Sequence, residues 1–78
     1  MAKNVTVYST PNCPWCHKAK DFLKENKIAF NDVDVSKDKK AAAEMVEKSG
    51  QMGVPVVDVN GTIIVGFDKN ALKKALGI

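Results

Sequence analysis

The sequence predicts an α/β fold, in which three helices cover one four-stranded mixed sheet in the order β-α-β-α-β-β-α. Runs of β-branched and aromatic residues alternate with stretches whose apolar residues recur at helical spacing, a pattern typical of alternating strands and helices. The dipeptide Asn60-Gly61 separates two short apolar runs, residues 56–59 and 62–65, and predicts a tight hairpin between them. The 78 residues contain no linker, repeat or low-complexity tract, so we expect a single domain over residues 1–78.

The first strand is expected at residues 5–8, where β-branched residues and a tyrosine precede a turn-like segment. A helix follows from Pro14, because proline suits the first helical turn, where its missing N–H is not needed. This helix should end near Asn26-Lys27. The residues that share its apolar face at helical spacing are Cys16, Ala19, Phe22 and Leu23.

The remaining elements are predicted in the same way. Residues 28–35 form the expected second strand, and residues 36–49 the second helix, with Gly50 as its C-terminal cap. After the hairpin, Asp68 is placed to cap a final helix. The expected inner face of the second helix is Ala42, Met45, Val46 and Ser49, and that of the final helix is Ala71, Leu72, Ala75 and Leu76.

The connections between the elements predict how the strands are arranged. The first strand, helix and second strand should form a parallel, right-handed unit. The hairpin should add an antiparallel pair on the other side of the first strand, which gives the strand order 2-1-3-4. The segment Val54-Pro55 then lies beside the end of the first strand, where Cys13 is located. Proline fits there, because a sheet tolerates it as the first residue of a strand.

The only two cysteines, Cys13 and Cys16, lie at the start of the first helix, with the only tryptophan, Trp15, between them. Unpaired N–H groups and the positive end of the helix dipole favour a thiolate at Cys13. One helical turn brings Cys16 back within bonding distance, on the apolar face of the helix. One sulfur is therefore exposed and activated and the other is shielded, which is the arrangement that thiol–disulfide exchange requires.

Composition and charge narrow the range of functions. The net charge of +3 comes from twelve lysines without arginine, spread along the chain, and is a poor match to nucleic-acid binding. The sequence shows no apolar signal region and no membrane span, so we expect a cytoplasmic protein without membrane association. In that reducing compartment, a pair of cysteines is more often catalytic or metal-binding than structural.

A metal or haem carrier is the competing interpretation of the same two sulfurs. The residues from Cys13 to His17 also spell the attachment motif of c-type haem, with His17 as axial ligand and Met45 or Met52 opposite. A zinc site lacks ligands within one chain, because only His17 is available beside the cysteines. An iron–sulfur cluster shared between two chains through Cys13 stays open.

Three motifs together resemble the glutaredoxin family: Cys13-Pro14-Trp15-Cys16, Gly53-Val54-Pro55 and Gly66-Phe67-Asp68. The similarity covers essentially the whole chain and implies a minimal thioredoxin-like fold. It implies that Cys13 is the nucleophile and Cys16 the resolving thiol. It also implies that Pro55 is a cis-proline whose neighbour Val54 pairs with the substrate through its backbone. The glutamyl end of glutathione would bind at the start of the last helix, at Asp68 and the backbone beside it.

Several positions depart from the usual glutaredoxin pattern. Thr10 replaces a lysine, Gly53 a threonine, Val65 the first glycine of a pair, and Trp15 a tyrosine. These changes weaken the glutathione site and leave the thiol chemistry intact. They make the chain somewhat like the small hydrogen donors of ribonucleotide reductase, which draw electrons from thioredoxin reductase. The match is partial, because those proteins have a different dipeptide between the cysteines and a Ser-Gly-Phe-Arg-Pro segment near the end.

The expected substrates and partners follow from the resemblance. A disulfide-containing protein or glutathione would be the substrate, and it would bind around Thr10, Trp15, Val54, Pro55, Gly66 and Asp68. Glutathione or a disulfide reductase, such as thioredoxin reductase, would supply electrons, and no tightly bound cofactor or metal is expected. We expect the protein to act as a monomer.

Overall fold

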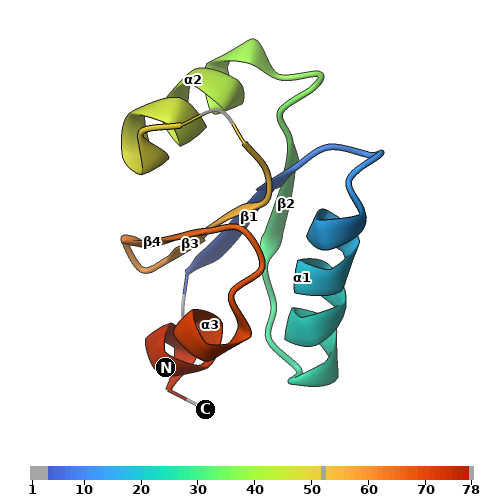
Figure 1. Ribbon diagram of the computed structural model, residues 1–78, viewed down its shortest axis with the longest axis vertical. Coiled ribbons are helices and arrows are strands. Elements are labelled where there is room, and N and C mark those ends of the chain that lie inside the picture. Colours follow the sequence, from blue (N-terminus) through green and yellow to red (C-terminus); the bar gives the residue numbers. More distant parts are fainter. Residues whose placement is uncertain (1–3, 52, 78) are drawn as a thin grey trace.

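The structure, a computed structural model, describes residues 4–51 and 53–77. Within these residues the elements follow the predicted order (Figure 1). They are β1 (Val5–Ser9), α1 (Pro14–Glu25), β2 (Asn31–Asp34), α2 (Lys39–Ser49), β3 (Val56–Val59), β4 (Thr62–Val65) and α3 (Lys69–Leu76). None of the helices in the described part of the chain is both long and apolar enough to span a bilayer.

The four strands form one sheet in the order β2-β1-β3-β4, as predicted. β1 pairs with β2 in parallel, with Tyr8 opposite Val33, and with β3 antiparallel, with Tyr8 opposite Val56. β3 and β4 are the two antiparallel strands of the hairpin. Because β1 is central and ends next to the start of β3, the chain segments that follow β1 and precede β3 lie side by side.

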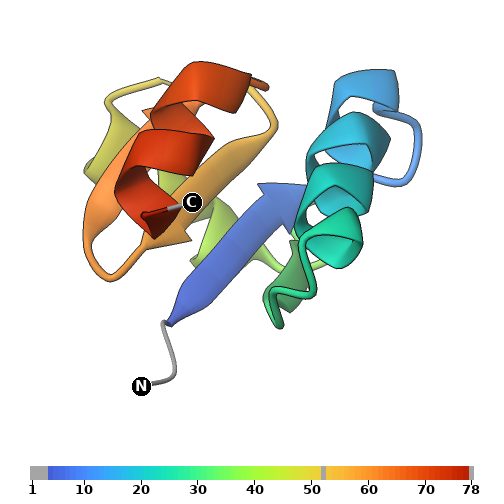
Figure 2. The same cartoon turned by 90° about the horizontal axis from the view of Figure 1, so that it is seen from below.

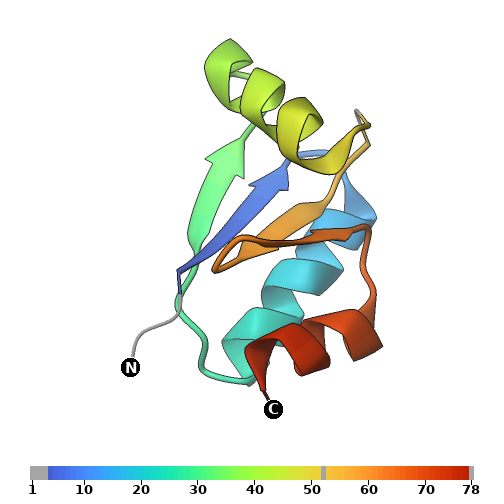
Figure 3. The same ribbon diagram turned by 90° about the vertical axis from the view of Figure 1, so that its left-hand side faces the viewer.

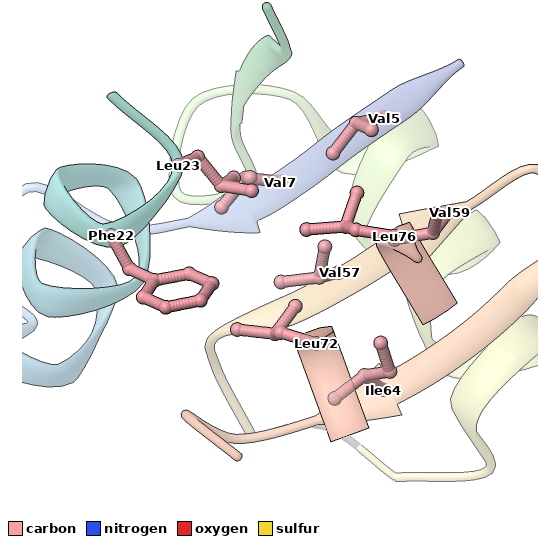
Figure 4. Packing of buried hydrophobic residues seen from close by; sticks show 9 residues of the cluster. All are labelled: Val5, Val7, Phe22, Leu23, Val57, Val59, Ile64, Leu72 and Leu76. Atoms are coloured by element: carbon pink, nitrogen blue, oxygen red, sulfur yellow. The ribbon is translucent and has the colours of Figure 1, made fainter. Parts of the chain in front are cut away.

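The sheet lies between α2 on one face and α1 and α3 on the other, as Figure 3 shows. Figure 2 shows α3 next to the β3–β4 half of the sheet, with α1 on the other side of β1. The larger core fills the space beneath α1 and α3 (Figure 4). Its buried residues are Val5, Val7, Phe22, Leu23, Val57, Val59, Ile64, Leu72 and Leu76. Strand residues alternate between the two faces of a sheet, so Tyr8 and Val56 are left for the opposite face.

The smaller core lies between α2 and that opposite face of the sheet. Tyr8 and Val56 pack there against Ala41 and Met45 of α2. Ala41 was not predicted for the inner face of this helix, whereas Met45 was. The other residues predicted for this face are only half-buried, and they are Ala42, Val46 and Ser49.

A polar contact lies on the same side of α2 as its apolar contacts with the sheet. Nζ of Lys48 donates hydrogen bonds to the Tyr8 hydroxyl at 3.1 Å and to Asp58 Oδ2 at 3.0 Å. These two hydrogen bonds raise the pKa of Lys48. Ala41, Met45 and Lys48 follow one another at helical spacing, so a single stripe of α2 carries both its apolar and its polar contacts with the sheet.

The second strand is shorter than predicted, because β2 begins at Asn31 and not at residue 28. Residues 27 and 28 instead close the C-terminus of α1. The N–H of Lys27 donates to the carbonyl oxygen of Lys24 at 3.0 Å, and the N–H of Ile28 to that of Leu23 at 2.9 Å. This pair of hydrogen bonds is a Schellman motif, and it places Lys27 in the left-handed region with a φ of 57°.

The second helix also begins later than predicted, at Lys39 instead of Ser36. Ser36 is part of a turn, where Asp34 Oδ1 accepts its N–H at 2.9 Å. The hydrogen bonds from Ser36 lower the pKa of Asp34. Asp38 then caps α2, because its Oδ1 accepts the N–H of Ala41 at 3.0 Å. The predicted C-terminal cap, Gly50, is confirmed, with a φ of 74°.

The hairpin and the last helix agree with the predictions. Asn60 and Gly61 both have positive φ, 51° and 94°, as a tight two-residue hairpin turn requires. Asp58 Oδ1 accepts the N–H of Gly61 at 2.7 Å and holds the turn closed. Asp68 caps α3 through the N–H of Ala71, at 3.0 Å.

Candidate active site

The candidate site lies where β1 ends and α1 begins (Figure 1). Cys13 is the N-terminal cap of α1, with an extended backbone at φ −103° and ψ 107°. Its Sγ accepts the backbone N–H of Cys16 at 3.2 Å, so a sulfur takes the place of the usual capping oxygen. Pro14 occupies the first turn, as predicted. The sulfur of Cys13 thus lies at the positive end of the helix, where negative charge is stabilised.

The two cysteines differ in their environment. Cys16 is fully buried, whereas Cys13 is half-buried. Burial raises the pKa of the Cys16 thiol to about 11, and the hydrogen bond and charge of Cys13 also raise it, against the opposite effects of the Thr10 backbone and Lys20. The predicted difference in exposure between the sulfurs is therefore confirmed. At neutral pH, Cys16 remains a thiol beneath the more accessible Cys13.

The loop before β3 lies against the nucleophile candidate. Sγ of Cys13 is 3.9 Å from the carbonyl oxygen of Val54. The Val54–Pro55 peptide bond is cis, as predicted. Pro55 is buried, and its carbonyl oxygen accepts the N–H of Gly66 at 2.8 Å. Segments far apart in the sequence are thereby brought to one place at the end of the sheet.

Trp15 lies exposed next to Cys13 and belongs to a row of three aromatic rings. Its ring centroid lies 6.5 Å from that of Phe67, and the Phe67 ring meets Phe22 edge to face at 6.1 Å. Nζ of Lys18 lies 4.4 Å from the centroid of the Trp15 ring, within the range of a cation–π contact. Although 55% of Trp15 is exposed, these contacts hold its ring in a defined place at the surface, where it can touch a bound molecule.

The two remaining predicted site residues have clear structural contacts. The carbonyl oxygen of Thr10 accepts the N–H of Cys13 at 3.4 Å, which closes the turn before α1. Asp68 follows Phe67 in the chain and caps α3 through its carboxylate. Backbone contacts and chain connectivity therefore link all the predicted site residues to one region around Cys13.

Sequence reasoning did not place Phe67 or Lys18 among the site residues. Phe67 was visible only as the middle residue of its motif, and its contact with Trp15 joins two distant parts of the chain. Lys18 follows Trp15 at a spacing of i, i+3, which places the two side chains on the same face of a helix. That spacing was the one signal available, and it resembles that of an ordinary solvated lysine.

Comparison with known proteins identifies the family. The chain matches the glutaredoxin family over residues 5–64, which is most of its length. The chain belongs to the glutaredoxin family. This member is 49% identical to a Clostridium pasteurianum protein described as an uncharacterized glutaredoxin-like 8.6 kDa protein in the rubredoxin operon, over 92% of this chain and 96% of that one. It is 37% identical to the glutaredoxin-like protein NrdH of Lactococcus lactis, over 90% of this chain and 96% of that relative.

Solved structures confirm the fold. A crystal structure of a variant of a thioredoxin-like protein superposes with a TM-score of 0.91 at 33% identity, covering 96% of both chains. The predicted minimal thioredoxin-like fold is thus confirmed. Membership of the glutaredoxin family makes this chain a thiol oxidoreductase. Glutaredoxin-family proteins generally use glutathione or a reductase as their source of electrons.

The family match does not favour the metal or haem carrier. Two methionines were considered as haem ligands. Met45, a residue of α2, is buried against the sheet, and Met52 lies outside the described residues. His17 contacts the carbonyl oxygen of Pro11 through Nε2 at 3.2 Å. Over residues 4–51 and 53–77, no three His, Cys, Asp or Glu side chains gather closely enough to hold a metal ion.

Proposed function

We propose that this protein reduces disulfides through a mixed disulfide formed at Cys13. The observation that carries the proposal is the position of Cys13 Sγ, at the N-terminus of α1 and 3.9 Å from the backbone of Val54. The thiolate of Cys13 attacks one sulfur of the substrate disulfide. A bond forms between Cys13 and that sulfur, and the other substrate sulfur leaves as a thiolate.

Cys16 completes the reaction. Its thiol loses a proton and attacks Sγ of Cys13, so that a Cys13–Cys16 disulfide forms and the second substrate thiolate leaves. Two electrons pass from the dithiol to the substrate, and solvent supplies the protons for the two leaving thiolates. The pKa of Cys16 is raised in part by the hydrogen bond and charge of Cys13. Those two contributions disappear in the mixed disulfide, so Cys16 becomes easier to ionise when it has to attack.

The substrate is proposed to lie in extended form beside the loop before β3. The backbone of Val54, held by the buried Pro55, pairs with it as one strand pairs with another. Trp15 contacts its neighbouring side chains, and Thr10 borders the nucleophile. When the substrate is glutathione, its glutamyl carboxylate binds where Gly66 and Asp68 lead into α3, because the N-terminus of a helix attracts anions.

We further propose that the substrates are disulfide-containing proteins or glutathione, and that glutathione or thioredoxin reductase returns the electrons. The 37% sequence identity to a glutaredoxin-like protein NrdH, over most of both chains, supports this range of partners. We also propose that the chain is a single domain that acts as a monomer without a tightly bound cofactor. A cytoplasmic location agrees with a dithiol that must be kept reduced.

Serine variants of the two cysteines test this mechanism. Cys13→Ser should abolish reduction of a disulfide peptide, because the nucleophile is lost. Cys16→Ser should still perform the first step and accumulate a mixed disulfide, which mass spectrometry of the unreduced protein detects as the added mass of one peptide. Circular dichroism confirms that both variants are folded. Activity of Cys13→Ser, or a mixed disulfide on Cys16 in the wild type, would show that the roles are assigned wrongly.

A further inference from the structure

The loop between α2 and β3 contains a side-chain clamp formed by Gln51. The carboxamide of Gln51 makes two hydrogen bonds to the backbone of Gly53. Its Nε2 donates to the carbonyl oxygen of Gly53 at 2.9 Å, and its Oε1 accepts the N–H of Gly53 at 2.6 Å. Both backbone groups of the residue next to Val54 are thereby occupied by one side chain.

The clamp is connected to the core through the end of α2. The hydroxyl oxygen of Ser49 lies 2.6 Å from the carbonyl oxygen of Met45 and 2.9 Å from that of Gln51. The N–H of Gln51 donates back to the same hydroxyl oxygen at 3.4 Å. Met45 is only 2% exposed, so a short series of hydrogen bonds leads from a buried residue to Gly53.

The other side of Val54 is fixed as well. Pro55 is buried, and its carbonyl oxygen accepts the N–H of Gly66. Val54 therefore lies between a clamped residue and an anchored one, with its carbonyl oxygen 3.9 Å from Sγ of Cys13. A backbone held in this way loses little conformational freedom when an extended substrate pairs with it.

The clamp also explains why a glycine stands at position 53. A Cβ on Gly53 would lie 2.6 Å from Oε1 of Gln51, which is closer than real Cβ atoms approach another heavy atom. The atom in the way is the far end of a flexible side chain, so a larger residue could be accommodated if Gln51 moved aside. A side chain at position 53 and the clamp therefore exclude each other.

We propose that Gln51 is a positioning residue, which holds the backbone around Val54 ready to pair with the substrate and acts through Gly53. This inference rests on the proposed function and adds a positioning residue to the same site. It assigns the glycine at position 53 a role, since glycine is what leaves room for the clamp.

Three variants test the clamp: Gln51→Ala, Gly53→Ala and the double variant. Each single change should lower kcat/KM for a disulfide peptide about two- to tenfold, because the two hydrogen bonds of the clamp are exposed to solvent and together contribute about as much as one ordinary hydrogen bond. The loss should appear mainly in KM, because the chemistry at Cys13 is untouched. The double variant should be no worse than either single variant, because both changes remove the same clamp. Gln51→Glu should not rescue activity, because a carboxylate cannot donate to the carbonyl oxygen of Gly53.

The rate at which iodoacetamide alkylates Cys13 separates positioning from a general structural effect. The alkylation rate should be unchanged in all variants. Glu47→Ala, at an exposed position of α2, is the control, and its activity should also be unchanged. An unchanged kcat/KM, additive losses in the double variant, or a parallel fall in alkylation rate would overturn the proposal. Failure of the proposed function itself is recognised separately, because the wild type would then reduce no disulfide and Cys13→Ser would change nothing.

Discussion

The proposed mechanism needs opposite environments for two sulfurs that lie one helical turn apart, and the first turn of α1 provides both. Cys13 replaces the capping oxygen of the helix and receives the N–H of Cys16, so negative charge on its sulfur is stabilised where the helix begins. Cys16 lies on the next turn but faces the core, where burial disfavours its charged form. The same backbone geometry thus suits the proposed roles of the two sulfurs, with Cys13 as the nucleophile and Cys16 as the resolving thiol.

The ionisation of Cys16 predicts how stability depends on pH. Its pKa rises from an ordinary value of 9.0 to about 11 in the folded protein. The unfolded protein therefore loses this proton first, and the reduced protein should lose stability as the pH rises from about 9 to about 11. Urea unfolding at several pH values measures this loss. Cys16→Ala serves as the control, and an equally steep loss in that variant would show that another group is responsible.

The central residues of the site could be predicted from local sequence patterns. Contacts that depend on the tertiary structure could not. Cys13 and Cys16 could be predicted from their spacing at a helix start, and the cis-proline at Pro55 from the resemblance to glutaredoxins. The clamp by Gln51 and the contact of Phe67 with Trp15 have no periodic signature. They depend on where loops from different parts of the chain come to lie.

At the scale of helices and strands, the boundaries reflect competition between neighbouring polar residues. Ser36 and Asp38 are both good N-terminal caps, and the sequence does not decide between them. In the structure, Asp34 binds Ser36 in a turn, which leaves Asp38 to start α2. The end of α1 was predicted correctly, but the start of β2 was not, because residues 27 and 28 bond to the end of α1 and Lys27 occupies a left-handed position that more often belongs to glycine.

Replacing the cap of α2 tests this boundary. Asp38→Ala should lower the free energy of unfolding by about 1 kcal/mol, because the N–H of Ala41 loses its acceptor. Lys37→Ala, next to it, is the matched control and should change little. Urea denaturation of the reduced proteins measures both. A larger effect from Ser36→Ala than from Asp38→Ala would instead place the start of the helix at Ser36.

At the scale of the whole molecule, the strand order was predictable because few topologies satisfy both a right-handed crossover and a tight hairpin. That order alone brings the end of β1 to the start of β3, and so brings Cys13 to Val54. The rotation of α2 was predicted only in part, because Ala41 and not Ala42 is buried against the sheet, and Lys48 on the same side of the helix reaches Tyr8 and Asp58. The spacing of apolar residues along the helix cannot predict a polar contact of this kind.

The choice of electron donor is a property of the whole active-site face. Thr10 offers no positive charge to the glycyl carboxylate of glutathione, and Val65, 50% exposed, stands just before the Gly66 backbone. We therefore predict weak use of glutathione and faster reduction by thioredoxin reductase, whose own dithiol needs only Cys13, Val54 and the surface around Trp15. The measurement supplies each donor in turn to the oxidised protein and follows the release of free thiols.

Two substitutions should shift this preference toward glutathione. Thr10→Lys restores a charge-assisted contact at a partly exposed site, which should speed reduction by glutathione about two- to tenfold. Val65→Gly should add to that effect by opening the approach to the backbone at Gly66. Both changes replace side chains only, and the backbone carbonyl of Thr10 that accepts the N–H of Cys13 stays in place, so the rate with thioredoxin reductase should stay nearly constant. Rapid reduction of the wild type by millimolar glutathione, with none by thioredoxin reductase, would reverse the prediction and place the protein among the glutathione-dependent members of its family.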